Sequence, residues 1–242
     1  MDFNYFGYNW TTLMEGRKIH PSFSYMYYDG VNTIRVNQEG DLELGIKYLP
    51  AVITDYQGTF ESTYAVATMR TKEKLKQGYL EAEIKLPRGK RLWPSFWLTG
   101  AGSWPPEIDI MEAWNENRGN YFRFTQPQPP YLVPGWRVTT NYHYKDWTAP
   151  DSQKQAIGSR QISIFKMWRS PDENFHKYGV YFDDNEIRFY VNGKLLRKTE
   201  VCKHCIAPFN IVLNVWCEQY SPIITSPMIV RNLKFEGEQE NG

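Results

Sequence analysis

The sequence lacks several features that would place it in whole classes of protein. No run approaches 18 apolar residues, so we expect no membrane-spanning helix. The amino terminus, Met1-Asp2-Phe3-Asn4, lacks the basic and then apolar pattern of a secretory signal. Either that export route does not apply, or the signal lies outside this chain. The net charge is only +1, which argues against a nucleic-acid or membrane-surface role.

Cysteine is also scarce, and the chain has only 3. Cys202-Lys203-His204-Cys205 has the spacing of half a zinc site, and Cys217 could supply a third sulfur ligand. A single CxxC pair is a weak signal, so structural cysteines are the favoured interpretation. We therefore predict no metal ligand among them.

Aromatic residues are abundant, with 9 Trp, 17 Tyr and 13 Phe, or 16% of the chain. So many rings fill a core, and they also suit a cleft that stacks the flat apolar faces of sugars. The length of 242 residues is normal for a β-sandwich, so we predict one domain over residues 1–242.

Strand patterns recur along the chain, and helix patterns hardly appear. Apolar and polar residues alternate over residues 42–48 and 80–86, as in half-buried strands. Asn192-Gly193 between two such runs predicts a hairpin with a type I′ turn over residues 186–196. Further strands are expected at 63–69, 138–143, 162–167, 175–182, 211–216 and 228–235. The pattern predicts an all-β fold, a jelly-roll sandwich of two antiparallel sheets.

One expected strand carries three acids, in the run Glu107-Ile108-Asp109-Ile110-Met111-Glu112. Alternate side chains of a strand share a face, so Glu107 and Asp109 point the same way while Glu112 breaks the parity. A β-bulge at Ile110-Met111 would restore it. Three acids would then share one sheet face, which is the equipment for cutting a glycosidic bond.

The stretch after this strand, residues 115–137, is rich in proline, glycine and aromatic residues. It is a candidate wall of a cleft, with Tyr121 and Arg123 as candidate substrate ligands. The alternative is a solvated insertion anchored by its own aromatic side chains.

Several segments, in order, resemble glycoside hydrolase family 16, the β-jelly-roll endo-glycanases that include laminarinases and lichenases. The resemblance covers residues 20–236. It rests on Gly78-Tyr79-Leu80-Glu81-Ala82-Glu83-Ile84-Lys85-Leu86-Pro87, Leu92-Trp93-Pro94-Ser95-Phe96-Trp97-Leu98, the acid strand in its bulged form, Phe175-His176-Lys177-Tyr178, Phe189-Tyr190-Val191-Asn192-Gly193, Pro208-Phe209-Asn210-Ile211-Val212-Leu213-Asn214 and Ser226-Pro227-Met228-Ile229-Val230.

The resemblance implies a concave substrate cleft and a role for each acid. Glu107 would be the nucleophile, Glu112 the general acid/base, and Asp109 the helper between them. A retaining mechanism needs its two working carboxyls about 5–5.5 Å apart, which neighbouring positions on one strand face can supply. The resemblance also implies a secreted or periplasmic protein. We expect a monomer with a polysaccharide as its partner.

Five further side chains are candidate substrate ligands. Trp97 is expected in the cleft, and Trp93, four positions away, would share its face. Trp114 and Trp216 end strands beside the expected cleft, where core packing is the alternative. His143 resembles the family histidine that contacts the reacting sugar, and a structural histidine is its alternative.

The chain departs from the family pattern at Arg231, where relatives often carry an aspartate that helps to bind a structural calcium. A cation in this position puts calcium in doubt. We therefore predict no cofactor.

Two other functions compete with hydrolysis. A jelly roll can serve a non-catalytic carbohydrate-binding protein, and the three acids could instead bind calcium. For the hydrolase, a β-1,3- or mixed-linkage β-1,3/1,4-glucan is the expected substrate. Sulfated galactans are the runner-up, because Arg118, Arg123 and Arg137 could recognise sulfate.

Overall fold

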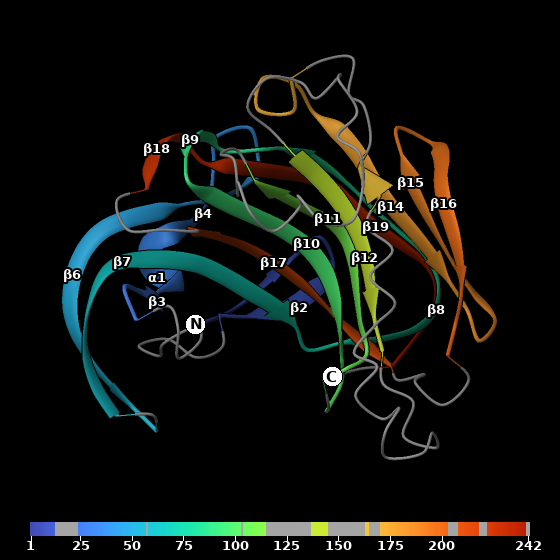
Figure 1. The fold of residues 1–242 in the computed structure, drawn as a ribbon, viewed down its shortest axis with the longest axis horizontal. Coiled ribbons are helices and arrows are strands. Elements are labelled where there is room, and N and C mark those ends of the chain that lie inside the picture. The colour runs from blue at the N-terminus through green and yellow to red at the C-terminus, as the bar shows by residue number, and fades with distance from the viewer. Residues whose placement is uncertain are drawn as a thin grey trace, which may run out of the picture.

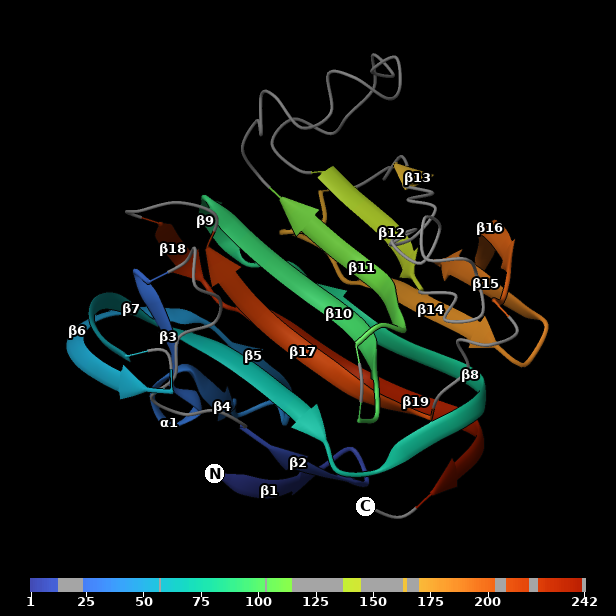
Figure 2. The same cartoon turned by 60° about the horizontal axis from the view of Figure 1, so that its bottom comes forward.

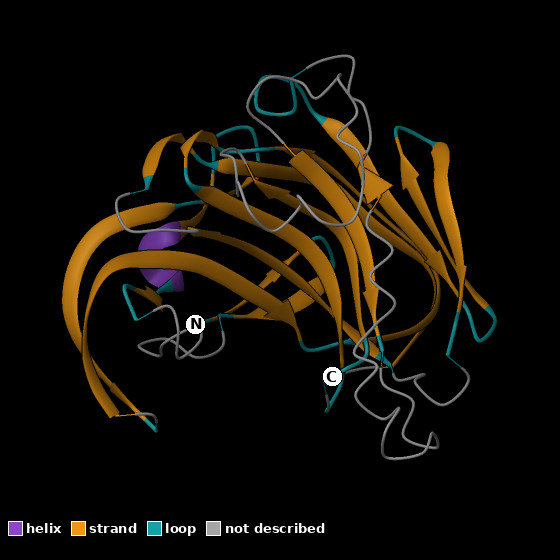
Figure 3. Cartoon of the chain, viewed as in Figure 1, coloured by secondary structure: helices purple, strands orange, loops and turns teal. Residues whose placement is uncertain are grey.

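The computed structural model describes residues 1–12, 24–56, 58–102, 104–114, 137–144, 163–164, 170–202, 208–217 and 222–240. Most of them lie in strands, as Figure 3 shows. The one helix among them, α1 (Gly30–Thr33), is a single turn, whose first residues are capped by Asp29 through a hydrogen bond from the Asn32 backbone. In this part of the chain no helix has the length and apolar character that crossing a membrane requires.

Two layers of strands face each other and curve together (Figure 1). The inner layer contains the acid strand, and neighbouring strands in it pair antiparallel. In spatial order it consists of β1 (Asp2–Tyr5), β2 (Tyr8–Thr11), β7 (Gly58–Thr71), β17 (Phe209–Cys217), β10 (Leu92–Gly100), β11 (Glu107–Trp114), β12 (Arg137–His143) and β13 (Ser163–Ile164).

The outer layer lies behind the inner one in Figure 2, and its neighbours also pair antiparallel. In spatial order it consists of β4 (Ile34–Val36), β5 (Leu42–Leu44), β19 (Met228–Glu240), β8 (Lys74–Lys85), β14 (His176–Phe182), β15 (Glu186–Val191) and β16 (Lys194–Glu200).

Four remaining strands extend this frame. Against the first half of β7 lie β6 (Ile46–Asp55), which is antiparallel to it, and β3 (Met26–Tyr28), which is parallel. A separate two-stranded sheet joins β9 (Arg88–Lys90) to β18 (Ile223–Ser226). The predicted sandwich of two antiparallel sheets is confirmed, with β3 as a parallel addition.

The main hydrophobic core lies between the two layers. Leu80, Ala82 and Ile84 on β8 are fully buried, as are Phe96 and Leu98 on β10. Each of these strands therefore buries alternate side chains, as the period-two pattern predicts. Burial of the apolar face also fixes the register, because a slip of one residue would move that face into solvent.

The predicted hairpin is confirmed in detail. Val191 pairs with Lys194 across the turn, and Asn192 and Gly193 have φ angles of 50° and 74°. Positive φ at both central positions is the property of a type I′ turn, and Asn-Gly is the pair that adopts it most readily. The turn thus follows directly from two residues of sequence.

Candidate active site

The acid strand β11 carries the predicted bulge. Its register against β10 shifts between Phe96 and Trp97, and its register against β12 shifts between Asp109 and Glu112. One extra residue therefore lies in β11 between Asp109 and Glu112, and the bulge predicted at residues 110–111 is confirmed.

The bulge puts the three acids on one face of the inner sheet. Together they line a cavity of about 150 Å³. Behind them Ile108, Ile110 and Met111 are buried in the core, with at most 1% of each exposed. The other residues that line the cavity are Trp93, Ser95, Trp97, Asn214 and Trp216.

Three of the four predicted cleft tryptophans reach this cavity. Trp93 and Trp97 come from β10, and Trp216 comes from β17, whose register puts it opposite Trp93. Trp114 is only 7% exposed and is not among the residues that line the cavity, and its ring centre lies 6.0 Å from that of Trp93. Strand alternation puts Trp114 on the same face of β11 as Glu112, so it lies beside Trp93 and is not part of the hydrophobic core.

Indole N–H groups bind the polar atoms of the cavity. Trp93 Nε1 donates a hydrogen bond to Glu112 Oε1 at 3.0 Å. Trp97 Nε1 donates to Asn214 Oδ1 at 2.7 Å. These bonds fix the orientation of both rings, and a rotamer held in advance costs less entropy when a ligand binds.

His143 lies beside the acids, at the end of β12 where it pairs with Glu107. Its Nε2 is 3.2 Å from Asp109 Oδ2 and 3.4 Å from Glu107 Oε1. Asn141 orients it: Oδ1 of Asn141 accepts from the Tyr142 backbone N–H, so its Nδ2 donates to Nε2 of His143, at 2.8 Å. His143 therefore contacts two acids directly, although it is not among the residues that line the cavity.

Burial and mutual repulsion make these acids reluctant to ionise. Burial, and after it the charge of Asp109, raises the pKa of Glu107 to about 8. Burial and then the charge of Glu112 raise the pKa of Asp109 well above its ordinary value. The cluster therefore retains protons at neutral pH, which is what a site needs to hold an acid and a base together.

A cation beneath the sheet opposes this effect. The positive charge of Arg197, on β16 of the outer layer, lowers the pKa of Asp109, against the larger effects of burial and Glu112. Its Nη1 donates to the Thr140 backbone oxygen at 3.4 Å, and its guanidinium lies 4.6 Å from the ring centre of Phe189. Burial, the main effect, lowers the pKa of Arg197 itself to about 10.

Sequence reasoning missed several residues of the site: Ser95, Trp104, Asn141, Arg197 and, as a named ligand, Asn214. Trp104 donates from Nε1 to Glu107 Oε2 at 2.9 Å. Asn214 could have been predicted from strand pairing, since it lies opposite Ser95 on the same face of paired strands. For Arg197 no local pattern exists, because it comes from the other layer. The predicted ligands Tyr121 and Arg123 lie outside the described residues.

Two groups of residues bear on metal binding. Ligand atoms of Glu107, Asp109 and His143 all lie within 4.8 Å of one another, so these residues could hold a metal ion. The set includes an imidazole, whereas calcium takes oxygen ligands, so it does not fit the calcium alternative. Cys202 is disulfide-bonded, which removes its sulfur as a zinc ligand, and Cys217 is a buried free thiol.

Arg231, the position where relatives often carry a calcium-binding aspartate, is a cation. Arg231 donates from Nε to Glu83 Oε2 at 2.9 Å, and its guanidinium lies 3.8 Å from the ring centre of Phe175. The neighbouring carboxylate is thus already neutralised. The residues present here do not fit a calcium ion.

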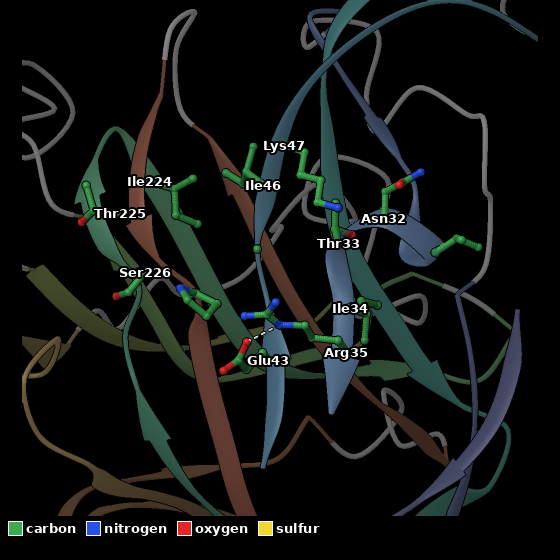
Figure 4. Close-up of a pocket in the computed structure, with 13 residues that line it drawn as sticks. Asn32, Thr33, Ile34, Arg35, Glu43, Ile46, Lys47, Ile224, Thr225 and Ser226 are labelled. Carbon is green, nitrogen blue, oxygen red and sulfur yellow. Dashed lines mark hydrogen bonds and ion pairs between the residues drawn. The ribbon is translucent and has the colours of Figure 1, made fainter. Parts of the chain in front are cut away.

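A second cavity, of about 340 Å³, lies between the segment from α1 to β6 and strand β18 (Figure 4). Its acid, Glu43, is paired with Arg35. Isoleucine side chains from three elements, Ile34, Ile46 and Ile224, also line it. A single neutralised carboxylate offers no acid–base pair, so the smaller cavity on β11 is the candidate active site.

A β-jelly roll whose inner sheet gathers three carboxyls and three indoles in one cavity is the arrangement expected in the class of carbohydrate-cleaving enzymes. Comparison with known proteins agrees with this class. The model of glycosyl hydrolases family 16 matches residues 24–221, and the chain belongs to this family.

Relatives of known activity resemble parts of the chain. A glucan endo-1,3-beta-glucosidase of Cryptopygus antarcticus is 40% identical over 184 residues, 73% of this chain and 57% of that protein. The endo-1,3-1,4-beta-glycanase EglC of Rhizobium meliloti (strain 1021) is 25% identical over 71% of this chain and 28% of its own length. The chain thus spans between about a quarter and about half of these two relatives.

Among solved structures, the catalytic domain of an endo-1,3-beta-glucanase (laminarinase) from Thermotoga petrophila RKU-1 superposes with a TM-score of 0.67. The two chains are 22% identical, and the match covers 100% of this chain and 94% of that one. This likeness independently supports the jelly-roll fold.

Proposed function

We propose that the chain is a retaining endo-β-glucanase that hydrolyses internal linkages of a β-1,3- or mixed-linkage β-1,3/1,4-glucan, acting as a monomer. The observation that carries the proposal is the cavity in which Glu107, Asp109 and Glu112 share one face with Trp93 and Trp97. Carboxyls supply the chemistry of glycosidic cleavage, and indole faces suit the apolar faces of sugar rings.

In the first step, a carboxylate oxygen of Glu107 bonds to the anomeric carbon of the sugar. Glu112 gives its proton to the leaving oxygen as the glycosidic C–O bond breaks. In the second step, the Glu112 carboxylate takes a proton from water, and the resulting hydroxyl displaces Glu107 from the anomeric carbon. Burial favours protonation of Asp109, which would remove the charge that raises the pKa of Glu107 and would let Asp109 donate a hydrogen bond to the ionised Glu107.

The names of the relatives support a β-glucan as the substrate, since those described above act on 1,3- or 1,3-1,4-linked glucans. The proposal for sulfated galactans rested on three arginines. Arg118 and Arg123 lie outside the described residues, and so does the side chain of Arg137. Sulfated galactans are therefore the less favoured substrate.

A digestion panel tests the proposal. We expect laminarin or lichenan to yield new reducing ends and short oligosaccharides early, and agarose and carrageenan to yield none. The Glu107→Gln variant, folded but without its nucleophile, is the matched control. Proton NMR at early times should show the β-anomer first, as a double displacement requires.

Each competing function predicts a different result. A non-catalytic carbohydrate-binding protein would bind glucan and release no reducing ends. A calcium-dependent site would lose activity on chelation and recover it with calcium. Release of monosaccharide alone would contradict cleavage inside the polymer.

A further inference from the structure

An exposed tryptophan outside the cavity lining contacts one acid of the site. Trp104 belongs to the connection between β10, which ends at Gly100, and β11, which begins at Glu107. It is 53% exposed, whereas tryptophan is a residue that proteins mostly bury. Its position is defined, because its indole Nε1 donates a hydrogen bond of 2.9 Å to Glu107 Oε2.

This bond acts on the carboxyl to which the mechanism assigns nucleophilic attack. The indole N–H is a donor only, so it favours the ionised carboxylate over the neutral acid. The other oxygen of Glu107, Oε1, faces His143 Nε2 at 3.4 Å. Trp104 thus donates to one oxygen of Glu107, and His143, whose Nε2 accepts from Asn141, lies beside the other oxygen. The rings of Trp104 and His143 are neighbours, with centroids 6.2 Å apart.

The other acid has a comparable partner in a different setting. Trp93 donates to Glu112, but its ring is packed between Trp114 at 6.0 Å and Trp216 at 5.3 Å. Trp104 instead presents much of its ring to solvent beside Glu107. A ring that is both fixed through its N–H and exposed through its surface is prepared to stack on a ligand.

We propose that Trp104 has two roles: it positions the nucleophile Glu107 through its N–H, and its exposed ring is the wall of a sugar-binding subsite next to that nucleophile. The inference rests on the proposed function, because it takes Glu107 as the group that bonds to the anomeric carbon. A glycosyl unit bonded there lies against the indole, and the C–H-rich face of a pyranose is the ligand class that the ring would take.

Two substitutions separate the two roles. Trp104→Phe keeps an aromatic face and removes the N–H, whereas Trp104→Ala removes both. The control is Tyr56→Ala, which removes an aromatic side chain 83% exposed at the β6–β7 turn and should leave the kinetics unchanged. All variants alter exposed side chains, and circular dichroism and thermal unfolding would verify that they fold.

For Trp104→Phe on laminarin, we expect kcat to fall about tenfold with KM nearly unchanged. The acidic limb of the pH profile of kcat/KM should move to higher pH, because the ionised form of Glu107 has lost a donor. The other groups that face Glu107 remain in place: Asp109 and Glu112 on β11, and His143 on β12. Arg197 on β16, which acts on Asp109, is also unchanged.

For Trp104→Ala, we expect the same shift of the acidic limb and, in addition, a rise of KM by roughly three- to tenfold from the lost stacking. A wild-type pH profile in Trp104→Phe would overturn the positioning role. Equal KM values for the Phe and Ala variants would overturn the subsite. Failure of wild-type protein on every glucan would instead reject the proposed function, and the inference with it.

Discussion

The acids of the two layers of the sandwich have opposite electrostatic surroundings. On the outer layer, carboxylates of half-buried or buried glutamates are each paired with a cation. On the inner layer, Glu107 and Asp109 of β11 form no ion pair with lysine or arginine among the described residues, and each lies close to His143. The outer pairs are Arg35–Glu43, Lys177–Glu81, Arg231–Glu83, Arg188–Glu186 and Lys198–Glu186.

The pKa shifts follow from this difference. Burial alone would raise the pKa of Glu83, but hydrogen bonds from Arg231 and Asn232 and the nearby charges outweigh it, so the pKa lies below its ordinary value. For Glu107, burial acts together with the charge of Asp109, and the pKa rises to about 8. The same residue type therefore stabilises the fold on one layer and, on the other, has the raised pKa that the proposed proton chemistry needs, at a cost in stability.

The largest expected contrast is in activity. Glu112→Gln removes the proposed proton donor of the inner layer, so we expect kcat on laminarin to fall by about 10²–10⁴-fold. Glu83→Gln, the matched change on the outer layer, should leave kcat within about twofold, because it touches no substrate. A Glu112→Gln variant with near wild-type turnover would remove Glu112 from the mechanism.

The second contrast is in the pH dependence of stability. Glu107 has a folded pKa of about 8 against an ordinary value of 4.5, so the folded state binds the proton more tightly. Its contribution to stability is fully present below about pH 4.5 and is lost as the pH rises toward 8. We therefore expect Glu107→Gln to raise the free energy of unfolding at pH 8 by a few kcal/mol and to change it little at pH 4.

Thermal unfolding of Glu107→Gln and wild type between pH 4 and pH 8 measures this effect. The wild-type Tm should decline more steeply than that of the variant over this range. Parallel curves would show that the acid cluster carries no electrostatic strain, and the contrast between the layers would then be wrong.

The smallest contrast concerns the outer layer alone. Arg231→Met removes the donor to Glu83 and the cation over Phe175, and since Arg231 is partly exposed we expect a loss of about 1 kcal/mol. This corresponds to a Tm lower by about 2–4 °C near neutral pH. Because the pKa of Glu83 is lowered in the folded state, its ion pair contributes to stability at pH values above the unfolded pKa. The Tm difference between Arg231→Met and wild type should therefore shrink as the pH falls through the folded pKa of Glu83.

The control for Arg231→Met is its activity at neutral pH, which should match wild type. A substantial loss of kcat would mean that the two layers are coupled, and that the outer charges also tune the site.

The sequence predicted those parts of the site that depend on one strand alone. Alternation along β11 required a bulge for Glu112 to join Glu107, and the register shows it. The two-residue turn at Asn192 could be predicted from the sequence because the requirement for positive φ is local.

Contacts between strands were less accessible to prediction. The donors to Glu107 and Glu112 are tryptophans whose reach depends on which strands pair and how the connection folds. The position of Trp114 next to Trp93 depended on the pairing of β10 with β11. The short strands β1, β2, β3, β4, β9 and β18 were missed because three or four residues show no period, and their pairing is set by tertiary contacts.

The bulge has a consequence for how such a strand can change over evolution. Deleting Met111 would leave Glu-Ile-Asp-Ile-Glu, in which strict alternation already places all three acids on one face and both isoleucines on the other. Ala113, now buried in the core, would keep its side of the sheet. Loss of a single codon here therefore leaves each remaining side chain on its present face of the sheet. It shortens the interval between two acids and removes one methionine from the interior.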